Sequence, residues 1–135
     1  MQHIEEVILP ALSDGIHVVS DRFTDATFAY QGGGRGMPSE DIEILEHWVQ
    51  GGLKPDLTLL LDVPLEVSMA RIGQTREKDR FEQEKADFFT RVRAVYLERA
   101  AAHPERYAII DSNRSLEEVR ADIEHALARS FGIDI

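Results

Sequence analysis

The chain contains 135 residues, of which 15 are basic and 25 are acidic, so its formal net charge is −10. This acidic excess disfavours sustained binding to a nucleic-acid backbone or to an anionic membrane surface. The absence of cysteine excludes disulfides and thiolate metal sites and fits a cytoplasmic protein, and the five histidines do not occur at metal-ligand spacing. No stretch approaches the roughly 20 apolar residues of a membrane span. The expected partner is therefore a small molecule.

The first half of the chain is predicted to contain helices and one strand. Apolar residues recur at helical spacing over residues 3–13, and the β-branched run at residues 16–20 favours a strand. Residues 24–31 are predicted to form one or two helical turns, which the following glycines would end. A further helix is expected with Ser39 as its N-cap and with Gly51-Gly52 at its end.

The second half begins with a nearly continuous apolar run at residues 57–61, which is typical of a parallel strand covered on both faces. The elements predicted after it are a helix over residues 64–73, a polar loop over 74–84, a long helix to about residue 102 with Tyr96 facing inward, a strand over 107–110, and a helix with Ser115 and Glu118 as its capping box. This order predicts an α/β fold with a thin parallel sheet.

Asp21 and Arg22 follow directly after the predicted strand at residues 16–20. Open α/β sheets bind ligands at the carboxyl ends of their strands. An arginine fork can hold two phosphate oxygens, and an aspartate beside it can hold Mg²⁺ directly or through water. Taken alone, such a pair is more often a surface ion pair, so the interpretation as a site depends on its position.

Two further features each allow a functional and a structural interpretation. The glycines around Arg35 could cradle a phosphate, but they follow a helical segment and precede no Lys-Ser/Thr, so they are not a Walker A loop; a flexible connection between helices explains them equally well. Arg71, Arg76 and Arg80 form the main basic group and fall on or beside the polar loop. A solvated loop and a lid that closes over phosphates both account for them.

The order of several motifs carries more information than any one of them. These motifs are Asp21-Arg22-Phe23, Thr27, Ala-Tyr-Gln-Gly-Gly-Gly-Arg-Gly at residues 29–36, Pro-Asp-Leu-Thr-Leu-Leu-Leu-Asp-Val at 55–63, Asp-Arg-Phe-Glu-Gln-Glu at 79–84 and Asp-Phe-Phe at 87–89. Over almost the whole chain they resemble bacterial thymidylate kinase. The resemblance implies a P-loop nucleoside monophosphate kinase fold, a parallel sheet with flanking helices, that transfers the γ-phosphoryl group of ATP to dTMP with the help of Mg²⁺. It also implies a homodimer.

The resemblance assigns roles to residues that match the motifs. Asp21 is similar to the acid near the metal and the phosphates, Arg22 to the residue that grips the dTMP phosphate, Thr27 to the position that touches thymine, Tyr30 to the aromatic under the sugar, and Gln31 and Arg35 to the monophosphate-side loop. The stretch from Arg71 to Arg80 is similar to the lid that closes over ATP, with Arg71 and Arg76 as lid residues and with the lid loop at about residues 73–84. The resemblance implies that the catalytic cations are Arg22, Arg76 and Arg80. Because Arg76 is the single arginine between the preceding helix and the Asp-Arg-Phe-Glu segment, which lid arginine is catalytic remains open.

The family's Gly-x-x-x-x-Gly-Lys-Ser/Thr loop and its first two strands precede the segment that matches Gln2, and this sequence contains none of them. Residues 1–135 are therefore expected to be the C-terminal two-thirds of a single thymidylate kinase domain. The sheet would have a central gap beside the strand at residues 16–20, leaving strand edges exposed. Without a cradle for the β and γ phosphates, catalysis by this chain alone is not expected.

Three functional hypotheses follow. The chain is an incomplete thymidylate kinase, or a non-catalytic remnant that binds dTMP or pairs with another chain, or part of another deoxynucleotide kinase with a related lid. The Tyr-Gln-Gly-Gly-Gly-Arg loop at residues 30–35 favours the monophosphate enzyme over the third hypothesis.

Overall fold

The computed structural model describes residues 2–71 and 80–133 of the chain. Two parallel strands form the centre of this part. β1 (Thr58–Asp62) and β2 (Tyr107–Asp111) pair residue by residue along their whole lengths. Both strands lie where apolar runs in the sequence predict them. The predicted α/β class with parallel strands is thereby confirmed.

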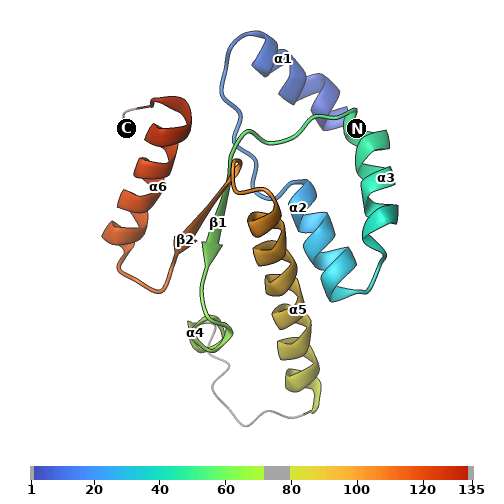
Figure 1. The fold of residues 1–135 in the computed structure, drawn as a ribbon, viewed down its shortest axis with the longest axis vertical. Coiled ribbons are helices and arrows are strands. Elements are labelled where there is room, and N and C mark those ends of the chain that lie inside the picture. The colour runs from blue at the N-terminus through green and yellow to red at the C-terminus, as the bar shows by residue number, and fades with distance from the viewer. Residues whose placement is uncertain (1, 72–79, 134–135) are drawn as a thin grey trace.

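Helices connect and cover the two strands. A parallel pair needs a crossover connection, and α4 (Leu65–Arg71) and α5 (Arg80–Ala102) belong to it. α6 (Leu116–Phe131) follows β2, and Figure 1 shows α5 and α6 on opposite sides of the strand pair. Because α5 begins at Arg80, the prediction of a loop as far as residue 84 is wrong: residues 80–84 are helical. The other residues of that predicted loop, 74–79, lie outside the described part.

The capping box predicted for α6 is present. The Glu118 backbone N–H donates to Ser115 Oγ at 3.2 Å, and the Ser115 N–H donates to Glu118 Oε2 at 2.9 Å. These bonds satisfy two backbone donors that a helix otherwise leaves without partners. The hydrogen bond from the Ser115 backbone also lowers the pKa of Glu118 below its ordinary value.

Residues 16–20 do not form a strand, and the prediction of one is wrong. They make no ladder pairing, and Val19 is 96% exposed. A β-branched run favours a strand only where a neighbouring strand offers backbone partners and a surface to pack on. A cavity lies between this segment and β1, so β1 offers it no backbone partners.

Helical segments precede and follow residues 16–20. The predicted N-terminal helix is present as a π-helical segment, η1 (Ile4–Ile8), continued by α1 (Leu9–Ser13). After residues 16–20 the chain forms α2 (Thr24–Thr27) and a second π-helical segment, η2 (Phe28–Gly34).

α3 (Ser39–Gln50) ends where the sequence predicts, but the prediction of Ser39 as its N-cap is wrong: Ser39 is the first helical residue, and Pro38 occupies the N-cap position without a side-chain hydrogen bond to the helix. It ends at Gly51, whose φ of 59° is the left-handed conformation that glycine adopts readily. Ile42 packs inward on this helix, whereas Trp48 is 83% exposed.

The glycines at 32–34 belong to η2, and Gly33 and Gly34 form a close contact with α5. The predictions that the helical turns end before these glycines and that the glycines form a flexible connection are therefore wrong. A Cβ atom built on Gly33 would lie 2.9 Å from the carbonyl oxygen of Arg91 and would overlap the side chain of Val95. One built on Gly34 would overlap the ring of Phe88. Glycine is therefore required here because the two helical segments approach so closely.

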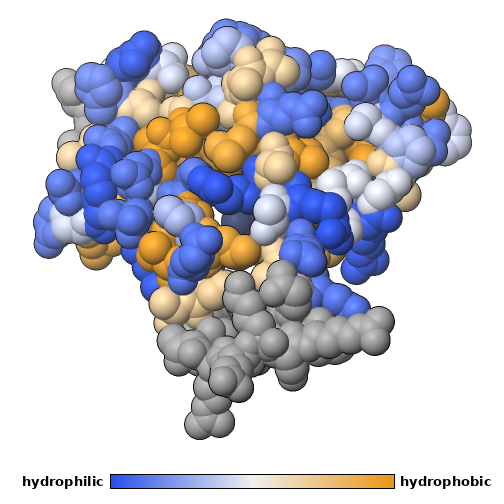
Figure 2. All heavy atoms as spheres, turned by 60° about the horizontal axis from the view of Figure 1, so that its bottom comes forward, coloured by the Kyte–Doolittle hydropathy of each residue, from blue (hydrophilic) through white to orange (hydrophobic). Residues whose placement is uncertain are grey.

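The core lies mainly where η2 meets α5 and α3 and where α5 adjoins β2. Its buried apolar residues are Ile4, Ile8, Phe28, Ala29, Ile42, Ala86, Val92, Ala100, Tyr107 and Ile110. Many other large apolar side chains are exposed. Figure 2, which brings the α4 end of the molecule forward, shows apolar side chains around a hollow in this face.

Candidate functional site

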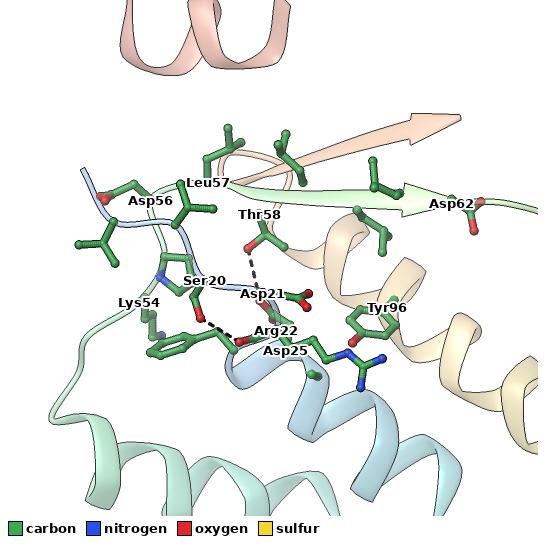
Figure 3. Close-up of a pocket in the computed structure, with 18 of the residues that line it drawn as sticks. Ser20, Asp21, Arg22, Asp25, Lys54, Asp56, Leu57, Thr58, Asp62 and Tyr96 are labelled. Carbon is green, nitrogen blue, oxygen red and sulfur yellow. Dashed lines mark hydrogen bonds between the residues drawn. The ribbon is translucent and has the colours of Figure 1, made fainter. Parts of the chain in front are cut away.

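An open cavity of about 820 Å³ lies between residues 17–26, β1 and α5. Leucines of β1 and the side chains of Val18 and Val19 supply much of its apolar lining. Figure 3 shows Asp21, Arg22 and Tyr96 close together at this cavity. An apolar wall combined with a few convergent polar groups is typical of sites for small ligands.

Arg22 adopts a conformation that is unfavourable for a side chain of its size. Its φ is 63°, and among the described residues other than glycine no other has a positive φ. Such a conformation costs on the order of 1–3 kcal/mol and persists where neighbouring contacts hold it, often at ligand sites. One such contact is the hydroxyl of Ser20, which donates to the carbonyl oxygen of Arg22 at 3.1 Å.

The guanidinium of Arg22 lies over an aromatic group. Its central carbon is 5.2 Å from the centre of the Tyr30 ring, within the range of a cation–π contact. The Tyr30 ring in turn lies 6.2 Å from Phe88 and 6.5 Å from Tyr96, both on α5. Side chains of η2 and α5 therefore position the guanidinium together. The N–H groups of a guanidinium can donate hydrogen bonds to two phosphate oxygens at once.

Tyr96 is a site residue that the sequence prediction placed only in the packed face of its helix. It is half-buried, and burial raises the pKa of its hydroxyl to about 12. At neutral pH Tyr96 is therefore an uncharged hydrogen-bond donor beside Arg22. Tyr96 occurs at the helical spacing of the apolar residues of α5, which is also the spacing of core residues. The sequence alone therefore does not distinguish a site tyrosine from a core tyrosine at this position.

Asp25 is buried at the first turn of α2 and is held by groups from three other segments. Arg99 Nε donates to its carboxylate at 2.6 Å, two nitrogens of Arg106 donate at 3.2 and 3.3 Å, and Thr58 Oγ1 donates at 3.4 Å. Burial alone would raise the pKa of Asp25, but the hydrogen bonds to its carboxylate, that from Arg106 being the largest, outweigh burial and hold the pKa below its ordinary value. The carboxylate is therefore ionised at neutral pH.

An ion pair closes the carboxyl end of β1. Arg93 donates to both carboxylate oxygens of Asp62, at 2.7 and 2.9 Å, and this hydrogen bonding lowers the pKa of Asp62. The Ser112 N–H donates to the Asp62 carbonyl at 2.8 Å, and Arg71 donates to the Ser112 carbonyl at 3.0 Å. Arg71, which was predicted as a lid residue, is the last residue of α4 and binds the turn after β2.

The remaining predicted substrate residues follow Arg22 along the chain. Thr27 ends α2 and is exposed, Gln31 lies within η2, and Arg35 follows the last residue of η2. These three are not among the described residues that line the cavity. The structure thus brings Asp21, Arg22 and Tyr30 together and leaves Thr27, Gln31 and Arg35 beside them on the chain.

The predicted lid lies largely beyond the described residues. Arg76 lies outside them, and so does the side chain of Arg80, so the catalytic roles of these arginines and the lid at residues 73–84 stay predictions. In the part of the chain that the structure describes, no three acidic or histidine side chains gather as a metal site would require. The same part contains no helix with the length and apolar character needed to cross a membrane.

The parallel strands and the helices that connect them belong to an incomplete α/β fold of the P-loop kinase-like kind, of whose sheet the described residues form two strands. The family model described as thymidylate kinase matches residues 1–123. The chain therefore belongs to the thymidylate kinase family.

Curated relatives agree with this assignment. A thymidylate kinase of Neisseria meningitidis serogroup B is 89% identical over 132 residues, and one of Neisseria gonorrhoeae strain NCCP11945 is 88% identical over the same length. Both alignments cover 98% of this chain and 64% of the relative. A thymidylate kinase of Cupriavidus necator is 58% identical over 127 residues, which cover 94% of this chain and 63% of that protein. The chain thus spans slightly less than two-thirds of the length of these relatives.

Proposed function

We propose that this chain provides the monophosphate side of a thymidylate kinase, which transfers the γ-phosphoryl group of ATP to dTMP and forms dTDP. The observation that carries the proposal is the position of the Arg22 guanidinium, which lies over the Tyr30 ring at the cavity beside Asp21. The backbone of Arg22 has a positive φ there. Membership of the family supplies the reaction.

In this proposal each residue acts on a specific part of the substrate. Arg22 binds the dTMP phosphate with its planar donors, which orients the acceptor oxygen toward the donor nucleotide. Tyr30 supports the guanidinium and packs under the sugar, and Tyr96 offers an uncharged hydroxyl to the same phosphate. Thr27, Gln31 and Arg35 contact the base and the monophosphate-side loop.

Asp21 is the proposed ligand for Mg²⁺. Its carboxylate is exposed at the cavity, and Mg²⁺ commonly uses one or two carboxylates together with waters and substrate phosphates, so a single acid fits this ion. When bound, the ion neutralises negative charge on the phosphate oxygens.

The proposed contribution of these residues is substrate binding, and turnover needs more. Phosphoryl transfer requires a cradle for the β and γ phosphates of ATP, and this sequence contains no Gly-x-x-x-x-Gly-Lys-Ser/Thr loop. We therefore place turnover in a full-length enzyme, with Arg22, Arg76 and Arg80 as the cations that stabilise charge on the transferred group.

Calorimetry with dTMP tests the proposal on this chain. We expect binding that Arg22→Ala weakens by about tenfold or more, because a charge-assisted hydrogen bond contributes roughly 1.5–3 kcal/mol. Arg120→Ala, which removes an exposed arginine paired with Glu124 on α6, is the matched control and should leave the affinity unchanged. An affinity for dTMP that is the same in Arg22→Ala as in the unaltered chain would contradict the proposal, and so would the absence of dTMP binding.

The substrate, the oligomeric state and the compartment are tested separately. A coupled assay on the full-length enzyme with dTMP, dUMP and dCMP should prefer dTMP; a preference for dCMP would favour another deoxynucleotide kinase. If dTMP binds but the full-length product of the native gene shows no turnover, the chain is the non-catalytic remnant.

We further propose a homodimer, which the exposed apolar side chains of Leu45 and Trp48 on α3 support, and a cytoplasmic location, which the lack of cysteine supports. Sedimentation would detect the dimer.

A further inference from the structure

Asp25 is the single buried charged residue among the described side chains, and it lies three positions after Arg22. It is 4% exposed, and its carboxylate binds Arg99 of α5, Arg106 of the turn before β2 and Thr58 of β1. These three partners belong to separate elements. One carboxylate therefore fixes the start of α2 relative to the sheet and to the long helix.

The two arginine partners are themselves fixed. Their side chains are 16% and 13% exposed, and each guanidinium stacks on a ring, Arg99 on Phe28 at 3.7 Å and Arg106 on Tyr107 at 4.9 Å. A buried ion cluster is a weak source of net stability, because desolvation offsets much of the attraction. What such a cluster can provide is a defined geometry, since its hydrogen bonds are satisfied in one arrangement only.

The residue that needs a defined geometry is Arg22. Its positive φ must be held from both sides. On the N-terminal side the Ser20 hydroxyl binds the Arg22 carbonyl. On the C-terminal side the Ala26 N–H donates to the Phe23 carbonyl at 3.1 Å, which closes the turn between Arg22 and the helix that Asp25 anchors. Figure 3 shows Arg22 and Asp25 emerging from this one turn, Arg22 toward Tyr96 and Asp25 toward Thr58.

We propose that Asp25, through Arg99 and Arg106, is a positioning residue that holds Arg22 in its strained conformation and so directs the guanidinium into the cavity. The proposal rests on the proposed function in one respect, namely that Arg22 binds the phosphate of dTMP. Asp25 itself does not touch the substrate, because its carboxylate is occupied by its three partners.

The first test is amide hydrogen exchange, which does not depend on any ligand. In Asp25→Asn the carboxylate loses its charge while its volume is kept. We expect faster exchange in peptides that cover residues 20–30 and unchanged exchange in α6. Asp122→Asn, which breaks an exposed pair between Asp122 of α6 and Arg114 of the turn before that helix, is the matched control and should leave residues 20–30 unaffected. Unchanged exchange at residues 20–30 in Asp25→Asn would overturn the proposal.

The second test is a double-mutant cycle in dTMP affinity. Asp25→Asn should weaken dTMP binding about tenfold when Arg22 is present and by less than about twofold in the Arg22→Ala background, because the effect passes through Arg22. Equal losses in both backgrounds would show that Asp25 acts on binding by another route and would overturn the proposal. If the unaltered chain does not bind dTMP, the proposed function fails, whereas hydrogen exchange still decides the role of Asp25.

A milder variant keeps both tests decisive should Asp25→Asn fail to fold. Arg99→Lys keeps the positive charge but loses the Nε hydrogen bond at 2.6 Å and the planar contact with Phe28. It should change exchange and affinity in the same direction by a smaller amount. Wild-type exchange at residues 20–30 in a folded Arg99→Lys protein would overturn the proposal.

Discussion

The contact between η2 and α5 and the groove between residues 16–20 and β1 both consist of apolar side chains, but only the first is buried. In the contact, Phe28 is 4% exposed and the glycines of η2 fit against Val95 and Phe88. In the groove, Val19 is 96% exposed and Leu61 is 55% exposed. Apolar content is therefore not sufficient for burial. A segment is buried where a complementary surface of the chain lies opposite it.

The candidate site lies at the boundary between these two regions. Tyr30, which lies under the Arg22 guanidinium, belongs to the well-packed contact between η2 and α5. The cavity that Arg22 enters is the groove between residues 16–20 and β1. The geometry of the arginine is thus set on the buried side, and its ligand would approach from the open side. Substitutions in the two regions should separate these contributions.

Truncation of Phe28 should show the largest difference between the regions. Phe28→Ala should lower the free energy of unfolding by about 3–5 kcal/mol, because it leaves a cavity in the core and removes the ring under Arg99. Val19→Ala should change it by less than about 0.5 kcal/mol, because its side chain is already in water. Urea denaturation measures both values, and similar losses for the two variants would contradict the comparison.

Adding one methyl group to the glycine contact should have a smaller effect. Gly33→Ala should cost about 2 kcal/mol, because the new Cβ meets the backbone of Arg91, which cannot move aside without shifting α5. Gly32→Ala is the matched control, since its new Cβ would meet the end of the Ile42 side chain at 3.1 Å and no backbone atom closer than 3.5 Å. Thermal unfolding should rank Gly33→Ala well below Gly32→Ala. The reverse order would show that η2 and α5 are not in close contact.

The sequence predicts the local features of the fold and misses those that depend on distant partners. Both strands, the end of α3 at Gly51 and the capping box of Ser115 follow from residues within a few positions of one another. The strand expected at residues 16–20 is wrong because a strand also needs a neighbour. The role of Gly33 could not be foreseen because Arg91 and Val95 meet it from a helix almost 60 positions further along the chain.

The candidate site divides in the same way. Asp21, Arg22 and Tyr30 were predicted from a contiguous motif, and the structure brings them together. Asp25 was missed, because its partners Arg99 and Arg106 are 74 and 81 positions away. The one local indication was that Asp25 lies close in the chain to Phe28 and Ala29, which pack inward. An acid in such a place needs a buried partner.

The acid stability of the chain tests whether the Asp25 cluster belongs to the well-packed region, and its effect should be the smallest of the three. The pKa of Asp25 is lower in the folded chain than the ordinary value of about 3.9, so on acidification the unfolded state takes up the proton first. Its stabilising contribution is complete above about pH 4 and is lost as the pH falls toward the folded-state pKa. Asp25→Asn lacks this contribution at every pH, so its free energy of unfolding, measured in urea from pH 6 to pH 3, should fall less steeply than that of the unaltered chain. Parallel curves would show that the carboxylate of Asp25 has the same proton affinity in both states, which would contradict its burial against Arg99 and Arg106.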